Sequence, residues 1–140
     1  MLIRRIENRI GPLGGKTVGI LGLSFKPNTD DVRDAKSIDL IRDLLAKGAS
    51  VKAYDPVAMP NASKFYSDLK VTYCHDAYSV AVNSHALILA TEWREFRHLN
   101  FQRVQASMVQ PVPLLADGRN FYDPERMRKY GFDYLCLGLP

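Results

Sequence analysis

The sequence predicts an α/β fold: a doubly wound, mostly parallel, Rossmann-like sheet of about five or six strands with helices on both faces. Short apolar runs alternate along the chain with segments of helical periodicity. Uninterrupted apolar runs are typical of parallel strands, which are covered on both faces. The 140 residues, of which 46% are hydrophobic and 24% charged, fit one soluble domain with a single core.

The first elements are a helix and a strand. Apolar residues recur at helical spacing within residues 1–10, and a glycine-rich segment with a proline follows at 11–15. The sequence offers this helix no obvious partner, so we expect it to be the end of a helix that continues from an upstream domain. Residues 1–14 would then be helix end and linker, and residues 15–140 a separate domain. The apolar run at 17–22 predicts the first strand.

The rest of the chain repeats the alternation. Gly48 fits the position just after a helix, and Pro124 fits the start of one. Between them His85 opens the clearest buried strand. We expect strands at about 50–54, 71–74, 85–90, 112–117 and 132–136, helices at about 35–47, 76–83, 96–108 and from 124 onward, and an irregular or short helical connection at 57–69.

A long polar loop, residues 22–33, follows the first strand. Loops between strand and helix usually have about 2–6 residues, and longer ones are often functional. This loop carries Lys26 and Arg33, and either cation can bind a phosphate. Arg119 follows the strand at 112–117, so it is expected at the same carboxyl edge of the sheet, where open α/β sheets bind ligands. Convergence of Lys26 and Arg119 would suit a diphosphate. The alternative interpretation of residues 22–33 is a charged surface loop that only joins a strand to a helix.

The first strand lacks a dinucleotide-binding fingerprint. Residues 19–24 read Gly-Ile-Leu-Gly-Leu-Ser, which is not G-x-G-x-x-G. An acidic residue at the end of the second strand binds the ribose in dinucleotide folds. Without the fingerprint we favour a turn-forming role for Asp55, which precedes Pro56. Trp93 either stacks on a ligand base or closes the edge of the domain, and we favour the second role.

Composition and residue spacing exclude several classes of function. The net charge is +4 in a mixed pattern, which argues against nucleic-acid binding and suits a small anion or an ordinary solvated surface. His75 has no Cys/His cluster around it, so no metal site is expected. Cys74 and Cys136 lie in apolar runs and are expected to be small buried hydrophobes. No run approaches the roughly 20 apolar residues of a membrane span, so a cytoplasmic protein is expected.

Three motifs follow one another along the chain. They are Leu-Ser-Phe-Lys-Pro-Asn-Thr-Asp-Asp-Val-Arg at 23–33, Thr-Glu-Trp-Arg-Glu-Phe at 91–96 and Asp-Gly-Arg-Asn at 117–120. With the ending at 131–138, they resemble the C-terminal, UDP-binding domain of UDP-glucose 6-dehydrogenases, in the UDP-glucose/GDP-mannose dehydrogenase family. Arg94 departs from the acidic or proline residue expected there, which leaves the packing of its loop open.

The resemblance implies roles for four residues. Phe25 and Lys26 resemble the family's contacts to the UDP-sugar, and Arg119 resembles the arginine that reaches the substrate across a domain cleft. Arg33 resembles the arginine that approaches NAD at the domain interface. No residue here matches the family's catalytic cysteine, which belongs to the N-terminal domain together with the dinucleotide fingerprint.

The resemblance also implies what the chain does and what it works with. The parent enzyme oxidises UDP-glucose to UDP-glucuronate with two NAD, and NAD is held mainly by the N-terminal domain. The chain alone would bind a UDP-sugar without catalysis or a metal, and the full enzyme would be a homo-oligomer. The alternative is a free-standing nucleotide-binding or assembly module with no redox activity.

Overall fold

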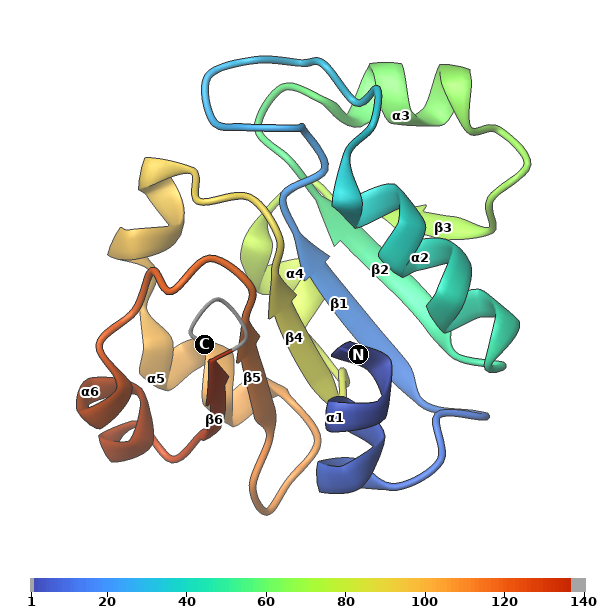
Figure 1. Cartoon of the computed structure of the whole chain (residues 1–140). Helices are drawn as coiled ribbons and strands as arrows, with labels where there is room; N and C mark the ends of the chain where they lie inside the picture. Colours follow the sequence, from blue (N-terminus) through green and yellow to red (C-terminus); the bar gives the residue numbers. More distant parts are fainter. Residues whose placement is uncertain (1, 137–140) are drawn as a thin grey trace.

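The computed structural model describes residues 2–136, which form one six-stranded sheet with helices on both faces (Figure 1). The strand order is β3-β2-β1-β4-β5-β6, and each neighbouring pair is parallel. The order reverses between β1 and β4, which makes the sheet doubly wound and confirms the predicted fold class. The strands are β1 (Thr17–Leu21), β2 (Ser50–Tyr54), β3 (Val71–Tyr73), β4 (Ala86–Leu89), β5 (Leu114–Asp117) and β6 (Asp133–Cys136).

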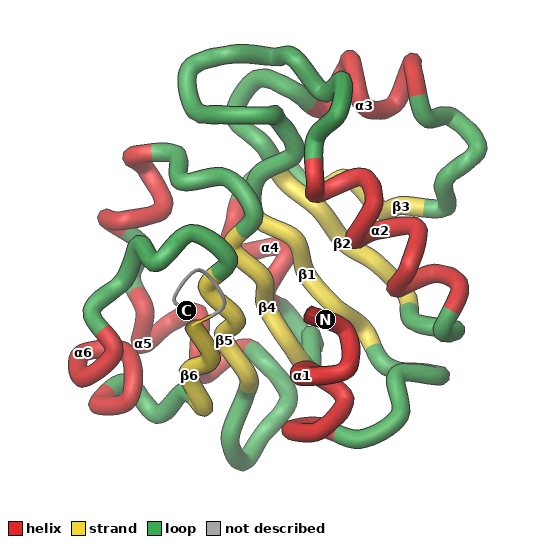
Figure 2. The backbone as a smooth tube through the Cα atoms, in the orientation of Figure 1, coloured by secondary structure: helices red, strands yellow, loops and turns green. Residues whose placement is uncertain are grey.

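The helices divide into two layers. Figure 2 shows α1 and α2 on one side of the sheet and α4 on the other. They are α1 (Leu2–Ile10), α2 (Lys36–Ala46), α3 (Met59–Phe65), α4 (Ala77–Ala81), α5 (Phe101–Ser107) and α6 (Pro124–Lys129), with a 3₁₀ helix η1 (Arg94–His98). None of these helices, within residues 2–136, has the length and apolar composition to span a bilayer. The end of the family resemblance, up to Gly138, lies outside the described residues.

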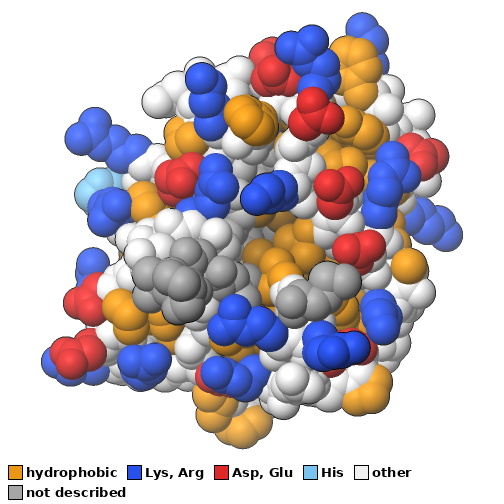
Figure 3. All heavy atoms as spheres, in the orientation of Figure 1, with side chains coloured by type: hydrophobic (Ala, Val, Ile, Leu, Met, Phe, Trp, Pro, Cys, Tyr) orange, Lys and Arg blue, Asp and Glu red, His pale blue; other side chains and the backbone are white. Residues whose placement is uncertain are grey.

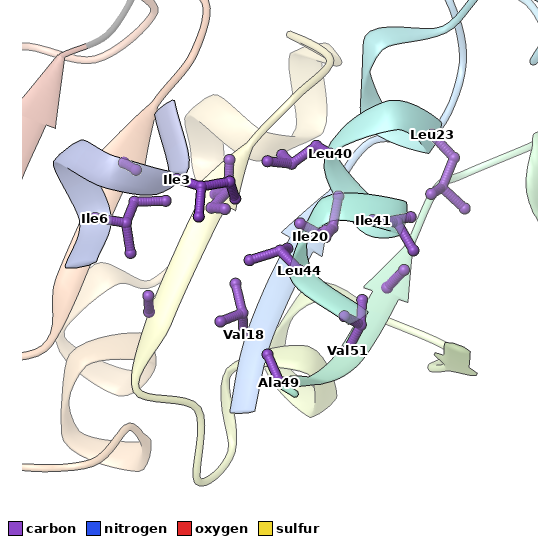
Figure 4. Close-up of a cluster of buried hydrophobic side chains, with 14 of the residues drawn as sticks. Ile3, Ile6, Val18, Ile20, Leu23, Leu40, Ile41, Leu44, Ala49 and Val51 are labelled. Carbon is purple, nitrogen blue, oxygen red and sulfur yellow. The ribbon is translucent and has the colours of Figure 1, made fainter. Parts of the chain in front are cut away.

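Helix α1 packs on the sheet, so the expectation that it has no partner in this chain is wrong. Ile6 is fully buried and Ile3 is 5% exposed, in one core cluster with residues of β4 and β5 (Figure 4). The crossover helix α2 lies over the β1–β2 side of this face and leaves the β4–β5 side open. Helix α1 covers that side, and an ion pair between Arg9 and Asp133 ties it to β6.

The predicted helix at 96–108 is interrupted. Leu99 is extended, with ψ at 153°, and separates η1 from α5. Asn100 caps α5, because its side chain accepts a hydrogen bond from the backbone N–H of Arg103 at 3.1 Å. Asparagine is among the strongest helix caps, so this residue was a usable signal for the break. Strand β5 also begins two residues later than predicted, at Leu114, after Pro113, which lacks a backbone N–H.

The two cysteines are half-buried and free rather than buried. Cys74 follows β3 and Cys136 ends β6, and these strands are the two edges of the sheet. A side chain at an edge strand has no neighbouring strand on one side, which explains its remaining exposure. Burial still raises the pKa of the Cys74 thiol above its ordinary value. The thiolate form of Cys74 is therefore disfavoured at neutral pH.

Candidate functional site

The loop after β1 leaves the sheet at Gly22, at the carboxyl edge of the strands. Gly22 has φ at +97°, a conformation that suits glycine, and it passes directly against Thr91 after β4. A Cβ on Gly22 would lie 2.4 Å from Thr91 Cβ and 2.6 Å from the Thr91 backbone nitrogen. The Thr91 hydroxyl donates to the Ser24 carbonyl at 2.8 Å. The loops after β1 and β4 are thus held together at the point where the strand order reverses.

Asp55, at the end of β2, anchors the start of the same loop. Its carboxylate is fully buried. The backbone N–H groups of Leu23 and Ser24 donate to Asp55 Oδ2 at 2.7 and 3.1 Å. A carboxylate that accepts backbone N–H groups makes strong, charge-assisted hydrogen bonds. Asp55 therefore fixes the direction in which the chain approaches Phe25 and Lys26.

Asp55 also holds two further segments. Trp93 Nε1 donates to the same Oδ2 at 3.0 Å, and the Trp93 side chain is largely buried, as expected for a residue that closes the edge of the domain. The other oxygen, Oδ1, accepts from the backbone N–H groups of Val57 and Ala58. The turn-forming role predicted for Asp55 is present, and the anchoring of the β1 loop and of Trp93 adds to it.

A second buried carboxylate, Asp117, shapes the loop after β5. The backbone N–H groups of Arg119, Phe121 and Tyr122 donate to it at 2.7–2.9 Å. The Tyr134 hydroxyl donates to it at 2.7 Å, and burial together with this bond raises the pKa of Tyr134. These contacts wrap the loop around one side chain and place Arg119 at the carboxyl edge of the sheet.

The three loops enclose a cleft of about 310 Å³. Phe25, Lys26 and Arg119, which the sequence singled out, all line it, so the predicted convergence of two cations at this edge is present. Phe25 is 53% exposed, so its ring adds an apolar surface beside the two cations. The full lining is Ser24, Phe25, Lys26, Asp34, Lys36, Ser37, Ala90 and Arg119.

Arg119 is held in place by Glu92, in the loop after β4. Arg119 Nε lies 3.1 Å from Glu92 Oε2, and both side chains are about one-third exposed, at 31% and 32%. The buried Nε–H is not aligned with the carboxylate, and no described residue accepts a hydrogen bond from it. The pair is therefore an electrostatic contact that orients the Arg119 guanidinium without a hydrogen bond through Nε.

Arg33 lies outside this cleft. It pairs with Asp31 through two contacts of 3.1 Å and is 83% exposed. The Asp31 carboxylate raises the pKa of Arg33, and Arg33 lowers that of Asp31. Arg33 lines a smaller neighbouring hollow of about 230 Å³, which shares Phe25 and Asp34 with the cleft. The structure thus separates Arg33 from the cations of the cleft.

The sequence interpretation missed Lys36, a third cation in the lining. Lys36 is the first residue of α2, and Ala35 before it supplies no side-chain cap. The next side chain, Ser37, is already engaged, because its hydroxyl donates to the Leu23 carbonyl at 2.9 Å. The signal for Lys36 was its place at the start of the first crossover helix, which lies at the same edge of the sheet as the β1 loop.

Two other hollows are larger than the cleft, but neither brings together cations from separate loops. One, of about 430 Å³, lies beside the β1 loop and carries Arg33 with Asp30 and Asp31. The other, of about 590 Å³, lies at the amino end of β2 and carries only Lys52 and Lys70 among charged residues. Within residues 2–136, no three His, Cys, Asp or Glu side chains gather as a metal would need.

Residues 19–124 match the model of the UDP-glucose/GDP-mannose dehydrogenase family, UDP binding domain. The chain belongs to this family. The match includes each candidate residue, from Phe25 to Arg119, and confirms the resemblance carried by the three motifs. As a UDP binding domain of the UDP-glucose/GDP-mannose dehydrogenase family, the chain is a part of an oxidoreductase family rather than a module unrelated to redox enzymes.

Several members of the UDP-glucose/GDP-mannose dehydrogenase family are similar over nearly the whole chain. The UDP-glucose 6-dehydrogenase of Rhizobium meliloti is 42% identical over 130 residues, which are 93% of this chain and 29% of that protein. UDP-glucose 6-dehydrogenase TuaD of Bacillus subtilis is 37% identical over 139 residues, 99% of this chain and 30% of TuaD. The chain thus spans about three-tenths of the length of these relatives.

Solved structures agree with the fold. The UDP-glucose dehydrogenase from Pyrobaculum islandicum superimposes with a TM-score of 0.81 at 32% identity, covering 99% of this chain and 29% of that one. Shikimate dehydrogenase from Aquifex aeolicus reaches a TM-score of 0.72 at 15% identity, over 98% of this chain and 48% of that one. The second likeness concerns the fold alone.

Proposed function

We propose that the chain is the UDP-sugar-binding, C-terminal domain of a UDP-glucose 6-dehydrogenase, in which Phe25, Lys26 and Arg119 bind the substrate. The observation that carries the proposal is the cleft at the reversal of strand order, which both Lys26 and Arg119 line. Ligands of open α/β sheets bind at this place. Two cations from separate loops suit a diphosphate, and exposed Phe25 offers an apolar surface beside them.

The parent enzyme would oxidise UDP-glucose to UDP-glucuronate with two NAD, in the cytoplasm and as a homo-oligomer. An N-terminal dehydrogenase domain would join this one through residues 1–14, and residues 15–140 would form the UDP-sugar domain. Because α1 is seated in the core of this domain, the end of such a connecting helix would be fixed to it.

We assign most of the NAD contacts to that N-terminal domain, with Arg33 contributing from the interface. Two observations support this. Residues 19–24 lack the glycine turn that brings a backbone close to a pyrophosphate. Asp55, at the position that binds a ribose in dinucleotide folds, is fully buried and already accepts hydrogen bonds from five N–H groups. The carboxyl edge of this sheet does not fit a dinucleotide in the usual manner.

Titration of the chain with UDP tests the proposal. Half of a two-domain site is expected to bind UDP weakly, with a Kd of about 1 mM. This Kd corresponds to a binding free energy of about 4 kcal/mol. Lys26→Ala and Arg119→Ala should each weaken binding by about 1.5–3 kcal/mol, the value of a hydrogen bond to a charged group. Calorimetry or NMR shift titration measures the loss, and thermal unfolding should show little change for either variant.

The control for these variants is Arg33→Ala, which removes a cation of the same loop outside the cleft. It should leave UDP affinity close to that of the unchanged chain. The assignment fails if Lys26→Ala and Arg119→Ala bind UDP as well as the unchanged chain does. If UDP binds only after the N-terminal domain of a relative is added, the same three variants are compared in that complex.

The chain by itself should produce no NADH from UDP-glucose and NAD. Burial raises the pKa of the Cys74 thiol and leaves its thiolate scarce, and no residue here matches the catalytic cysteine of the family. Absorbance of NADH during incubation of a pure preparation provides the measurement. Turnover that persists through repeated purification would refute a purely substrate-binding role.

A further inference from the structure

Lys36 lies where two hollows of the carboxyl edge meet. The cleft that holds Lys26 and Arg119 and a second hollow of about 280 Å³ share Lys36, Ser37, Ala90 and Arg119. The second hollow adds an apolar lining of Leu2, Leu40, Ile88 and Leu89, together with Gly118. The two hollows therefore adjoin at these four residues. We call the pair the groove, and its charged end is the cleft and its apolar end the second hollow.

The groove runs across the face that carries α1 and α2. Figure 3 shows hydrophobic side chains gathered in a hollow near the middle of this face, with Lys and Arg side chains around it. Lys36 and Arg119 belong to both parts of the groove, whereas Lys26 lines the charged end. A ligand that extends along the groove would pass Lys36 whichever way round it lies.

The charges of the groove are unbalanced. Lys26, Lys36 and Arg119 line the charged end, against the single carboxylate of Asp34. Arg119 has Glu92 as its counterion, but neither lysine forms an ion pair with any of residues 2–136. Like charges that line one concave surface raise the local potential and attract an anion. A nucleoside diphosphate carries about three negative charges at neutral pH, since its terminal phosphate has a second pKa near 6.

We propose that Lys36 is a further phosphate-binding residue of this groove and completes a triad of cations with Lys26 and Arg119. The inference rests on the proposed function and deepens it, because three cations favour a diphosphate over a monophosphate. The side chain of Lys36 supplies a point charge at the start of α2, and the side chain of Arg119 supplies a planar fork on the opposite loop. The ligand class is a nucleoside diphosphate or its sugar ester.

The test compares Lys36→Gln with Lys70→Gln in the chain, with UDP, UMP and uridine as probes at low salt. Lys70 is exposed and lies at the amino end of β3, in the hollow of about 590 Å³, so its replacement makes the same change of net charge away from the groove. Lys36→Gln should weaken UDP binding about tenfold, as one lost hydrogen bond to a charged group does. It should weaken UMP less and leave uridine unchanged, whereas Lys70→Gln should change none of the three.

Lys36→Arg keeps the charge and should retain most of the UDP affinity. Equal UDP binding by Lys36→Gln and the unchanged chain overturns the inference. An equal loss of UDP affinity in Lys70→Gln also overturns the inference, because the loss would then come from the change of net charge or from the other hollow. Failure of the proposed function looks different: Lys26→Ala and Arg119→Ala would then also leave UDP binding unchanged.

Discussion

Replacement of Asp55 by alanine should destabilise the domain by about 4 kcal/mol or more, the largest effect expected from a single polar side chain here. The change leaves the buried N–H groups of Leu23 and Ser24 and the indole N–H of Trp93 without their acceptor. Each unsatisfied buried donor costs about 1–3 kcal/mol. Urea unfolding measures the loss as a shift of the midpoint at constant slope.

Asp123→Ala is the matched control, because Asp123 caps α6 from an exposed position with one hydrogen bond to the backbone N–H of Glu125. That change should cost about 1 kcal/mol, as the loss of a helix cap does. Asp55→Asn keeps the shape and one acceptor oxygen and should fall between the two. An Asp55→Ala protein that is as stable as Asp123→Ala would show that water or a shifted loop replaces the carboxylate.

Gly22→Ala should cost about 3–5 kcal/mol and should also disturb UDP binding. A residue with a Cβ at φ +97° is strained, and the added Cβ would meet the backbone and side chain of Thr91 at 2.4–2.6 Å. Backbone atoms cannot give way as a flexible side chain does. The loops after β1 and β4 would move apart, and Lys26 would move with the first of them.

Gly15→Ala separates the two causes. Gly15 has φ at +78°, but nothing lies within 4 Å of the position of its Cβ. Gly15→Ala should therefore lower the free energy of unfolding only by the cost of the left-handed backbone conformation, about 1–2 kcal/mol. Thermal and urea unfolding of both variants give the difference, which is the cost of the contact with Thr91. Equal losses would mean that the two loops separate without cost.

The fold was predictable because its strands are covered on both faces. Such strands appear in the sequence as uninterrupted apolar runs, and the helical periods between them fixed the alternation. The packing of α1 was not predictable in the same way. The spacing of Ile3 and Ile6 shows that the helix has an apolar face, but β5, which that face contacts, lies more than 100 residues away in the chain.

The sequence predicted two of the cations that lie at the candidate site, but not the buried carboxylate that holds the loops in place. Lys26 and Arg119 follow strands that end at one edge, so topology alone brings them together. The role of Asp55 depends on backbone N–H groups 31 and 32 positions earlier, which carry no signature in the side-chain pattern. Lys36 is the first residue of a helix, where a lysine in the sequence is read as an ordinary solvent-exposed residue. Its place in the cleft was therefore not apparent from the sequence.

The buried carboxylate of Asp55 has a consequence for protein engineering. The strand order of this domain is that of dinucleotide-binding proteins, so it invites the grafting of a G-x-G-x-x-G turn onto residues 19–24. Such a graft alone would not create a cofactor site. The acidic side chain needed to hold a ribose is occupied from within by the very loop that the graft would replace. A successful redesign would first have to re-anchor that loop and Trp93 by other means, and only then release the carboxylate to a ligand.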